Sequence, residues 1–304
     1  MEYISIGKDP ISISRVGFGT GSSGYSGEIR QAGLAPGELS GLLVYSYDRG
    51  INFWDTAASY GTYPHIREAL KVVPRRKVVI SSKFSDSLEK TTARRIYETL
   101  KSLQTDYLDI CLLHGPRNAF EIMMRSGALE ALLKAKEKGY IRMVGLSAHG
   151  IGAIERAMVM EEIDLLFVRL NWTGASMDAY QEGPLSKLIA VPYVKEIARS
   201  VVPRRLVPSF SGRVESLKSN ADEREVVKDR LSGCPGRNKA VVAMKVFGAG
   251  SLTDRIERSL QYIMSLRYVD AFLLGMTSRA EIDENLEIYD KIIGKKHALS
   301  QMSM

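Results

Sequence analysis

The chain has 304 residues, of which 45% are hydrophobic and 25% are charged, and its formal net charge is +7. This length is sufficient for one globular domain spanning residues 1–304. No apolar run approaches the roughly 20 residues of a membrane span, and residues 1–9 lack a secretory-signal pattern. The two cysteines, Cys111 and Cys234, suggest neither a disulfide framework nor a metal site, so we expect a reducing cytoplasm.

The positive net charge raises the question of a nucleic-acid partner. The basic residues are scattered through helical stretches among acidic ones, and no nucleic-acid-binding motif accompanies them. We therefore expect no nucleic-acid partner and no membrane partner, and a homo-oligomer remains open.

The first 37 residues predict a hairpin, a strand and a loop. Residues 1–14 alternate apolar and polar side chains around a Gly7-to-Pro10 turn, which indicates a β-hairpin. Residues 16–20 form the next predicted strand. The glycine-rich residues 21–37 predict a flexible loop in which the backbone can approach a ligand closely.

Strands and helices then alternate in the rhythm of a parallel barrel, in which each helix returns the chain to the start of the next strand. The predicted strands begin near Ile51, Val78 and Tyr107 and continue at 141–146, 165–170, 241–246 and 269–274. The predicted helices are 38–48, 65–72, 91–103, 126–138, 151–160, 254–266 and 281–292. The fold class is therefore α/β, a (β/α)8 TIM barrel with an N-terminal hairpin.

The alternation breaks between Trp172 and Asn238, between the sixth and seventh barrel strands. This insertion is longer than one crossover needs and contains two predicted helices, at 185–200 and 222–231. Because it leaves the C-terminal end of a strand, we expect it to cover the substrate. A surface elaboration or a subunit contact is the alternative.

Four ionisable side chains follow three successive strands. Asp55 and Tyr60 follow the second barrel strand, Lys83 ends the third and His114 ends the fourth. Singly, such residues can be a turn former, a packing aromatic, a solvated lysine and a satisfied core histidine. Together they predict one pocket, because the C-terminal ends of parallel barrel strands converge.

These four residue types suit proton transfer to a carbonyl oxygen that receives a hydride. Tyrosine has a free pKa of about 10, so a positive neighbour such as Lys83 must stabilise its phenolate. Asp55 can keep that lysine charged, and His114 can donate an N–H to the substrate oxygen. An isomerase or lyase in which Lys83 forms a Schiff base is an alternative that borohydride trapping would reveal.

The order and spacing of Asp55, Tyr60, Lys83 and His114 resemble the catalytic tetrad of the aldo-keto reductases. The resemblance extends to four stretches, residues 14–21, 50–61, 139–147 and 275–285. It implies an NAD(P)H-dependent oxidoreductase that reduces an aldehyde or ketone to an alcohol, or runs in reverse, for example on a sugar. Tyr60 would be the general acid/base.

The resemblance also implies where a nicotinamide dinucleotide binds. The implied cofactor residues are Gly19, Thr20, Gly21, Asp55, Ser147, Phe167, Met244, Lys245, Phe247, Ser278, Arg279 and Asn285. Free N–H groups at a helix start near Ser278 would favour a phosphate there. Simple capping of that helix by Thr277 or Ser278 is compatible with this role.

Several residues depart from the family pattern. Ala148 replaces a carboxamide-binding Asn, Phe167 replaces a Gln, and Met244 replaces the Tyr that stacks on nicotinamide. Glu281 replaces an Arg that often grips the 2′-phosphate, although Arg279 is in a position to substitute for it. NADP(H) is favoured, and NAD(H) remains open because acidic side chains accept ribose hydroxyls.

A cofactor-binding barrel that acts as a sensor or accessory subunit with little turnover is the other reading of this pattern. It would retain the same four residues, so cofactor oxidation with varied aldehydes separates the two functions. The sequence does not name the physiological substrate, beyond a small carbonyl compound or sugar.

Overall fold

The computed structural model describes residues 1–302 except 23–28, 36, 175–230 and 232–238. The two helices predicted within the insertion, at 185–200 and 222–231, lie outside the described residues apart from Leu231.

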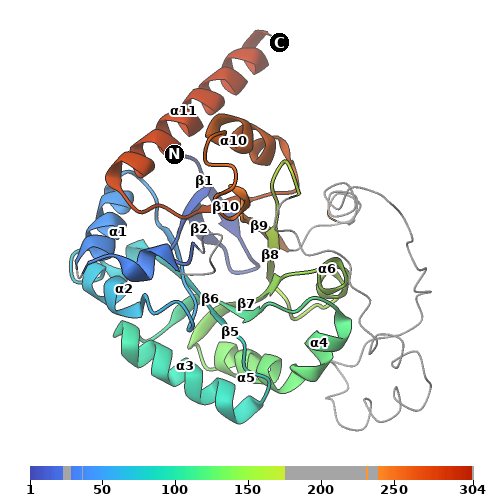
Figure 1. Ribbon diagram of the computed structural model, residues 1–304. Coiled ribbons are helices and arrows are strands. Elements are labelled where there is room, and N and C mark those ends of the chain that lie inside the picture. Colours follow the sequence, from blue (N-terminus) through green and yellow to red (C-terminus); the bar gives the residue numbers. More distant parts are fainter. Residues whose placement is uncertain (23–28, 36, 175–230, 232–238, 303–304) are drawn as a thin grey trace.

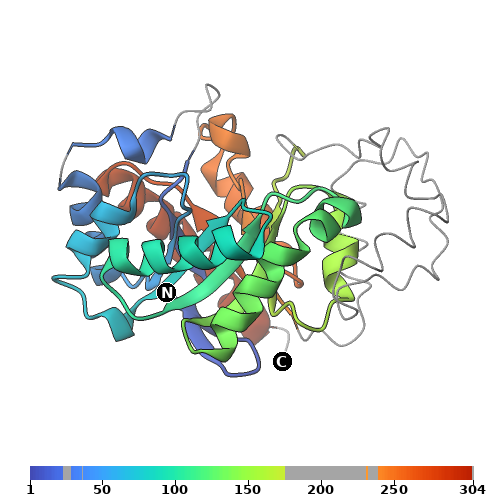
Figure 2. The same ribbon diagram turned by 90° about the horizontal axis from the view of Figure 1, so that it is seen from below.

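The chain begins with the predicted hairpin. Strands β1 (Tyr3–Ile6) and β2 (Ile11–Ser14) pair antiparallel, with Ile6 opposite Ile11. Gly7 has a φ of 82°, which a residue with a side chain adopts only with strain. Figures 1 and 2 show that the hairpin lies across one end of the barrel.

Eight parallel strands form a closed barrel in the order β3-β4-β5-β6-β7-β8-β9-β10, which confirms the predicted fold class. They are β3 (Val16–Gly19), β4 (Phe53–Asp55), β5 (Val79–Phe84), β6 (Leu108–His114), β7 (Ile141–Ala148), β8 (Leu165–Arg169), β9 (Ala240–Met244) and β10 (Ala271–Leu274). The barrel closes where Phe272 of β10 lies opposite Val16 of β3.

Helices surround the barrel (Figure 1). The α-helices in the described part of the chain are α1 (Glu38–Asp48), α2 (Tyr63–Ala69), α3 (Glu89–Leu103), α4 (Ala119–Met124), α5 (Ser126–Glu137), α6 (Ile151–Met158), α10 (Ile256–Ser265) and α11 (Arg279–Met302). Short 3₁₀ helices are η1 (Arg30–Gly33), η2 (Arg75–Lys77) and η4 (Gly248–Gly250). None of the described helices has the length and apolar content needed to cross a membrane.

The predicted helices lie close to the observed ones, with small differences at most of their ends. The helix predicted at 38–48 matches α1, whereas α2 begins and ends a little earlier than 65–72. The short α4 is absent from the predicted helices, because its six residues are too few to show an apolar repeat. Its start is marked by Asn118, which accepts the Glu121 N–H. Helix α11 continues past Ile292 to Met302 and extends beyond the barrel in Figure 1.

The core has two layers. Inside the barrel, Phe53, Ile110, Phe167 and Val242 pack with the hairpin residue Ile13. Outside it, the opposite faces of the same strands pack against the helices. The alternation of side chains along each strand produces both layers.

Aspartates near the starts of three strands join neighbouring strands. Asp109 accepts the N–H of Ile80 on β5, Asp164 accepts that of Val144 on β7, and an Asp270 oxygen accepts that of Val241 on β9. Each carboxylate therefore fixes one strand against the preceding one.

Asp109 also forms ion pairs with Arg75 (2.7 Å) and Arg142 (3.0 Å), although its own side chain is only 1% exposed. We expect Asp109→Ala to lower the free energy of unfolding by about 3 kcal/mol, because it removes a buried charged acceptor. Glu68→Ala is the control, because Glu68 pairs with Lys71 at the surface and its loss should cost much less. Urea unfolding measures both, and equal losses would contradict the role of Asp109.

Candidate active site

The barrel brings the four predicted residues to one rim. Asp55 ends β4, Lys83 lies near the end of β5, and His114 ends β6. Neighbouring strands place Asp55 opposite Ser81. Tyr60 lies in the loop between β4 and α2, on the same side of the barrel.

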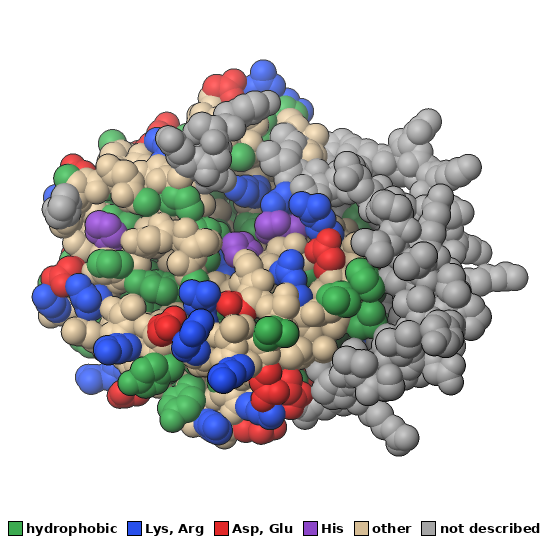
Figure 3. Space-filling model, turned by 60° about the horizontal axis from the view of Figure 1, so that its bottom comes forward, with side chains coloured by type: hydrophobic (Ala, Val, Ile, Leu, Met, Phe, Trp, Pro, Cys, Tyr) green, Lys and Arg blue, Asp and Glu red, His purple; other side chains and the backbone are tan. Residues whose placement is uncertain are grey.

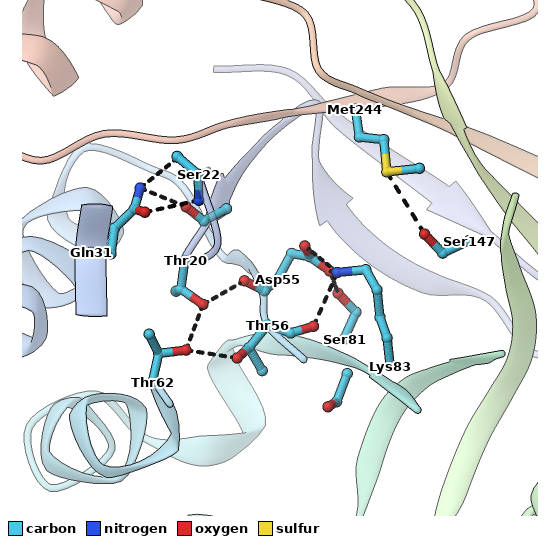
Figure 4. A network of polar contacts seen from close by, with 12 residues as sticks. Thr20, Ser22, Gln31, Asp55, Thr56, Thr62, Ser81, Lys83, Ser147 and Met244 are labelled. Atoms are coloured by element: carbon cyan, nitrogen blue, oxygen red, sulfur yellow. Dashed lines mark hydrogen bonds and ion pairs between the residues drawn. The ribbon is translucent and has the colours of Figure 1, made fainter. Parts of the chain in front are cut away.

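Asp55 and Lys83 form a buried ion pair (Figure 4). The Lys83 Nζ lies 2.7 Å and 2.6 Å from the two Asp55 carboxylate oxygens, and it donates a third hydrogen bond to the Thr56 carbonyl at 3.0 Å. The Lys83 side chain is 1% exposed and the Asp55 side chain is 5% exposed. Ser81 donates its hydroxyl to Asp55 at 2.6 Å. Burial raises the pKa of Asp55, whereas the Lys83 charge and the hydrogen bonds from Lys83 and Ser81 favour the ionised carboxylate.

Burial and charge act in opposite directions on this pair. Burial alone lowers the pKa of Lys83, but the Asp55 carboxylate and Tyr60 outweigh that effect and raise the pKa. Lys83 therefore stays protonated inside the barrel.

Tyr60 lies directly against the lysine. The Lys83 Nζ is 5.1 Å from the centroid of the Tyr60 ring. Gly21 also contacts the ring, since a methyl group added there would lie 2.1 Å from Cε2 of Tyr60. The backbone of the loop after β3 thus fits against the ring only because residue 21 has no side chain.

His114 lies beside Tyr60, with their ring centroids 6.2 Å apart in an edge-to-face arrangement. Burial, and then the charge of Lys83, lower the pKa of His114 to about 3. The imidazole is therefore neutral near pH 7 and retains one N–H to donate.

The structure adds His149 and Arg169, which the sequence analysis did not single out. The rings of His149 and His114 are 5.6 Å apart, and Arg169 Nη2 lies 2.7 Å from His149 Nδ1. Burial, and then the charge of Arg169, lower the pKa of His149 to about 2. Both residues follow the strand-end rule that identified His114, since Arg169 ends β8 and His149 follows β7.

A cavity at the rim is bordered by Asp55, Tyr60 and Lys83 but not by His114. Its lining comprises Gly19, Gly21, Ser22, Arg30, Asp55, Tyr60, Lys83, Met244, Lys245, Val246, Phe247, Ala249, Gly250, Thr253, Leu273 and Gly275. Figure 3 shows histidine, lysine and arginine side chains gathered around a hollow on this face. Eight of the predicted site residues therefore border one cavity, namely Gly19, Gly21, Asp55, Tyr60, Lys83, Met244, Lys245 and Phe247.

The remaining predicted cofactor residues lie outside that lining. Thr20, Ser147 and Phe167 are fully buried, and Asn285 is 4% exposed. Ser147 donates its hydroxyl to the sulfur of Met244 at 3.7 Å.

Helix α11 begins beside the cavity, where Ser278 and Glu281 cap it. Ser278 Oγ accepts the Glu281 N–H at 3.1 Å, and Glu281 accepts the Thr277 N–H at 2.6 Å. Arg30, which the sequence analysis also missed, lies 3.6 Å from the Glu281 carboxylate. The Arg279 guanidinium instead lies 5.0 Å from the Tyr45 ring and borders a second cavity between α1 and α2.

The donors along the cavity suit an anionic dinucleotide. Lys245 and Arg30 border the cavity with basic side chains, although burial lowers the pKa of Lys245. The Lys83 charge is balanced by Asp55. The loop after β9 adopts positive φ at Lys245 (60°), Ala249 (57°) and Gly250 (96°), a backbone in which a ligand can approach main-chain groups closely. The residues present therefore fit a bound nicotinamide dinucleotide.

Comparison with known proteins gives a consistent match. A model of the Aldo/keto reductase family matches residues 15–297. A probable aldo-keto reductase 1 from Glycine max is 26% identical over 274 residues, covering 80% of this chain and 75% of that protein. An L-galactose dehydrogenase from Arabidopsis thaliana is 23% identical over 303 residues, covering 94% of this chain and 87% of that protein.

Among solved structures, a putative aldo-keto reductase from Pseudomonas aeruginosa aligns with a TM-score of 0.68 and 20% identity. The alignment covers 96% of this chain and 95% of that one. At this identity the likeness supports the barrel fold.

We expect the His114 ring signals to stay constant from pH 8 to pH 5, because a pKa of about 3 keeps the folded imidazole neutral. In urea-unfolded protein the same signals should titrate near pH 6.5. The unfolded state then binds more protons, so stability should fall as the pH drops below about 6.5. NMR of the imidazole carbons tests this, and a folded-state midpoint near pH 6.5 would contradict the buried environment.

Proposed function

The chain belongs to the aldo/keto reductase family, and on that basis we propose that it reduces an aldehyde or ketone carbonyl to an alcohol with NAD(P)H. The reverse reaction, for example on a sugar, uses the same groups. We place this activity in the cytoplasm, with a small carbonyl compound or sugar as the substrate.

The observation that carries the proposal is the position of Tyr60 against a buried ammonium group. A free phenol has a pKa of about 10 and gives up its proton reluctantly near pH 7. The Lys83 charge, 5.1 Å from the ring centroid, stabilises the phenolate that remains after transfer. Asp55 keeps that charge in place and neutralises it when the site is at rest.

In this proposal Tyr60 donates its proton to the carbonyl oxygen, and His114 donates an N–H to the same oxygen. The low pKa of His114 supports this role, because a neutral imidazole orients an oxygen without competing with Tyr60 as an acid. The half-buried setting of His114 also limits competition by water.

When bound, the nicotinamide dinucleotide supplies the hydride. We assign its binding to the residues predicted from the sequence: Gly19, Thr20, Gly21, Asp55, Ser147, Phe167, Met244, Lys245, Phe247, Ser278, Arg279 and Asn285. To these we add Arg30. NADP(H) is the favoured cofactor, because two guanidinium groups, those of Arg30 and Arg279, lie near the start of α11.

We expect Tyr60→Phe to lower kcat for aldehyde reduction by about 10²- to 10⁴-fold, because it removes the proton donor. The dissociation constants of the dinucleotides should stay within a few-fold, since the hydroxyl contributes little to ground-state binding. Steady-state kinetics against sugars, aliphatic aldehydes and aromatic aldehydes, together with fluorescence titration of the cofactor, measure both quantities.

The matched control is Tyr63→Phe, three residues along the chain. Tyr63 shares a hydrogen bond with Ser82 at 2.7 Å and does not border the cavity. It should retain most of the turnover. If Tyr60→Phe turned over as fast as Tyr63→Phe, the proposed acid would be wrong. A wild type that binds dinucleotide but reduces no carbonyl would favour the sensor function instead.

Cofactor preference should depend on the two arginines. We expect Arg30→Ala and Arg279→Ala each to weaken NADPH more than NADH, because a guanidinium group can pair with the 2′-phosphate. The loss from a charge-assisted hydrogen bond is roughly 1.5–3 kcal/mol.

Glu281→Arg is the reciprocal test. It removes a negative charge beside Arg30 and adds a positive one, so it should shift preference further toward NADPH. Dissociation constants of both cofactors for the three variants decide the matter. If the two alanine variants weaken NADH and NADPH equally, the adenosine phosphate does not lie at the start of α11.

A further inference from the structure

Three threonine hydroxyls form a buried chain beside the tetrad (Figure 4). Thr20 follows β3, Thr56 follows β4 and Thr62 precedes α2, and all three residues are fully buried. The Oγ1 atoms of Thr20 and Thr62 lie 2.8 Å apart, as do those of Thr62 and Thr56. Thr20 also donates to the backbone carbonyl of Asp55 at 2.9 Å.

The direction of every proton in this chain is fixed. The Asp55 carbonyl can only accept, so the single hydroxyl proton of Thr20 points to it. Thr62 must then donate to Thr20, and Thr56 must donate to Thr62. Each hydroxyl therefore has one orientation. Hydrogen bonds aligned in a chain polarise one another, which makes each of them stronger.

The chain of hydroxyls closes the loop that carries Tyr60. That loop starts at Thr56, whose backbone carbonyl accepts from Lys83 and whose N–H donates to the Ser81 carbonyl at 2.9 Å. It ends at Thr62, two residues after Tyr60. The Thr56–Thr62 hydrogen bond therefore ties the end of the loop to its beginning, and its beginning is held by the catalytic ion pair.

The same hydroxyls set the other wall of Tyr60. Thr20 immediately precedes Gly21, whose backbone packs so closely on the Tyr60 ring that an added methyl group would lie 2.1 Å from Cε2. The Thr20 N–H also donates to the Asp55 carbonyl, at 2.8 Å. Thr62 consequently connects the segment that bears Tyr60 to the segment against which its ring rests.

We propose that Thr62, acting through Thr20 and Thr56, is a positioning residue that fixes the Tyr60 ring between Lys83 and Gly21. This role rests on the proposed function of Tyr60 as the acid. Thr62 is fully buried and does not border the cavity, so we expect its loss to change the placement of the proton donor and not the binding of either ligand. A misplacement of the reacting groups by about 1 Å lowers rates by about 10²-fold.

The test is Thr62→Val, which keeps the shape of the side chain and removes both hydroxyl bonds. We expect kcat to fall about 10- to 100-fold, while the KM for the carbonyl and the dissociation constant of the dinucleotide stay within about threefold. Thr62→Ser, which retains the hydroxyl, should recover most of kcat. Thr56→Val breaks only the last link and should give a smaller loss, so it serves if Thr62→Val folds poorly.

The matched control is Thr92→Val in α3. Thr92 is also fully buried and donates its hydroxyl to the Leu88 carbonyl at 2.9 Å, and it does not border the cavity. It should lower the urea midpoint to a similar extent without changing kcat. If Thr62→Val lowers kcat no more than Thr92→Val, or if Thr62→Ser fails to rescue it, the positioning role is overturned.

A second readout separates this role from the reductase activity itself. In protein labelled with 3-fluorotyrosine, the ¹⁹F signal that Tyr60→Phe removes belongs to residue 60. We expect that signal to shift or broaden in Thr62→Val and to return in Thr62→Ser, while Thr92→Val leaves it unchanged. An unchanged signal in Thr62→Val would contradict the proposal even if turnover were lost. If the wild type showed no turnover, the proposed reductase function would be refuted, but the ¹⁹F signals would still test whether Thr62 positions the Tyr60 ring.

Discussion

A charged lysine inside the barrel is the constraint on which the site depends. An ammonium group removed from water tends to lose its proton, because desolvation disfavours the charged form. Asp55 prevents this at 2.6–2.7 Å, and Ser81 and the Thr56 carbonyl satisfy the remaining groups. An ion pair this dry is costly unless every partner is in place. The pairing of the ends of β4 and β5 at the site therefore depends on Lys83 being protonated.

The barrel meets that requirement from outside the site. The hairpin fills one end, so the rim at the other end is the part of the barrel open to ligands. Aspartates such as Asp109 hold neighbouring strands in register near their N-terminal ends. Because register is fixed there, Asp55, Lys83 and His114 arrive together at the C-terminal ends, where the threonine hydroxyls then hold the loop that carries Tyr60.

Much of this arrangement follows from patterns in the sequence. Short apolar runs that end in Asp55, Lys83 and His114 place these side chains at strand ends, and parallel strands bring strand ends together. The same rule predicts the barrel, and together with the family resemblance it identifies eight of the sixteen residues that line the cavity. It fails where a residue's role depends on the path of a loop. No periodic pattern marks Arg30 or Thr62. Their partners, Glu281 and Thr20, lie far from them in the sequence.

Electrostatic roles were equally hard to read from the chain alone. The sequence makes Arg279 a candidate for the cofactor phosphate. It does not show that the Arg279 guanidinium lies against the Tyr45 ring. The low pKa of His149 depends on burial and on Arg169 from a neighbouring strand. Such values emerge only after the strands are assembled, because desolvation and charge at a site are properties of the whole fold.

The most direct measurement is single-turnover transfer of deuterium from a cofactor deuterated at C4 of the nicotinamide to a carbonyl substrate. Wild-type protein should yield an alcohol that carries deuterium on the carbinol carbon. Lys83→Met should bind the cofactor within a few-fold of wild type yet form that product about 100-fold more slowly, since Tyr60 loses its charged neighbour. Equal transfer rates in the two proteins would contradict the central role of the ion pair.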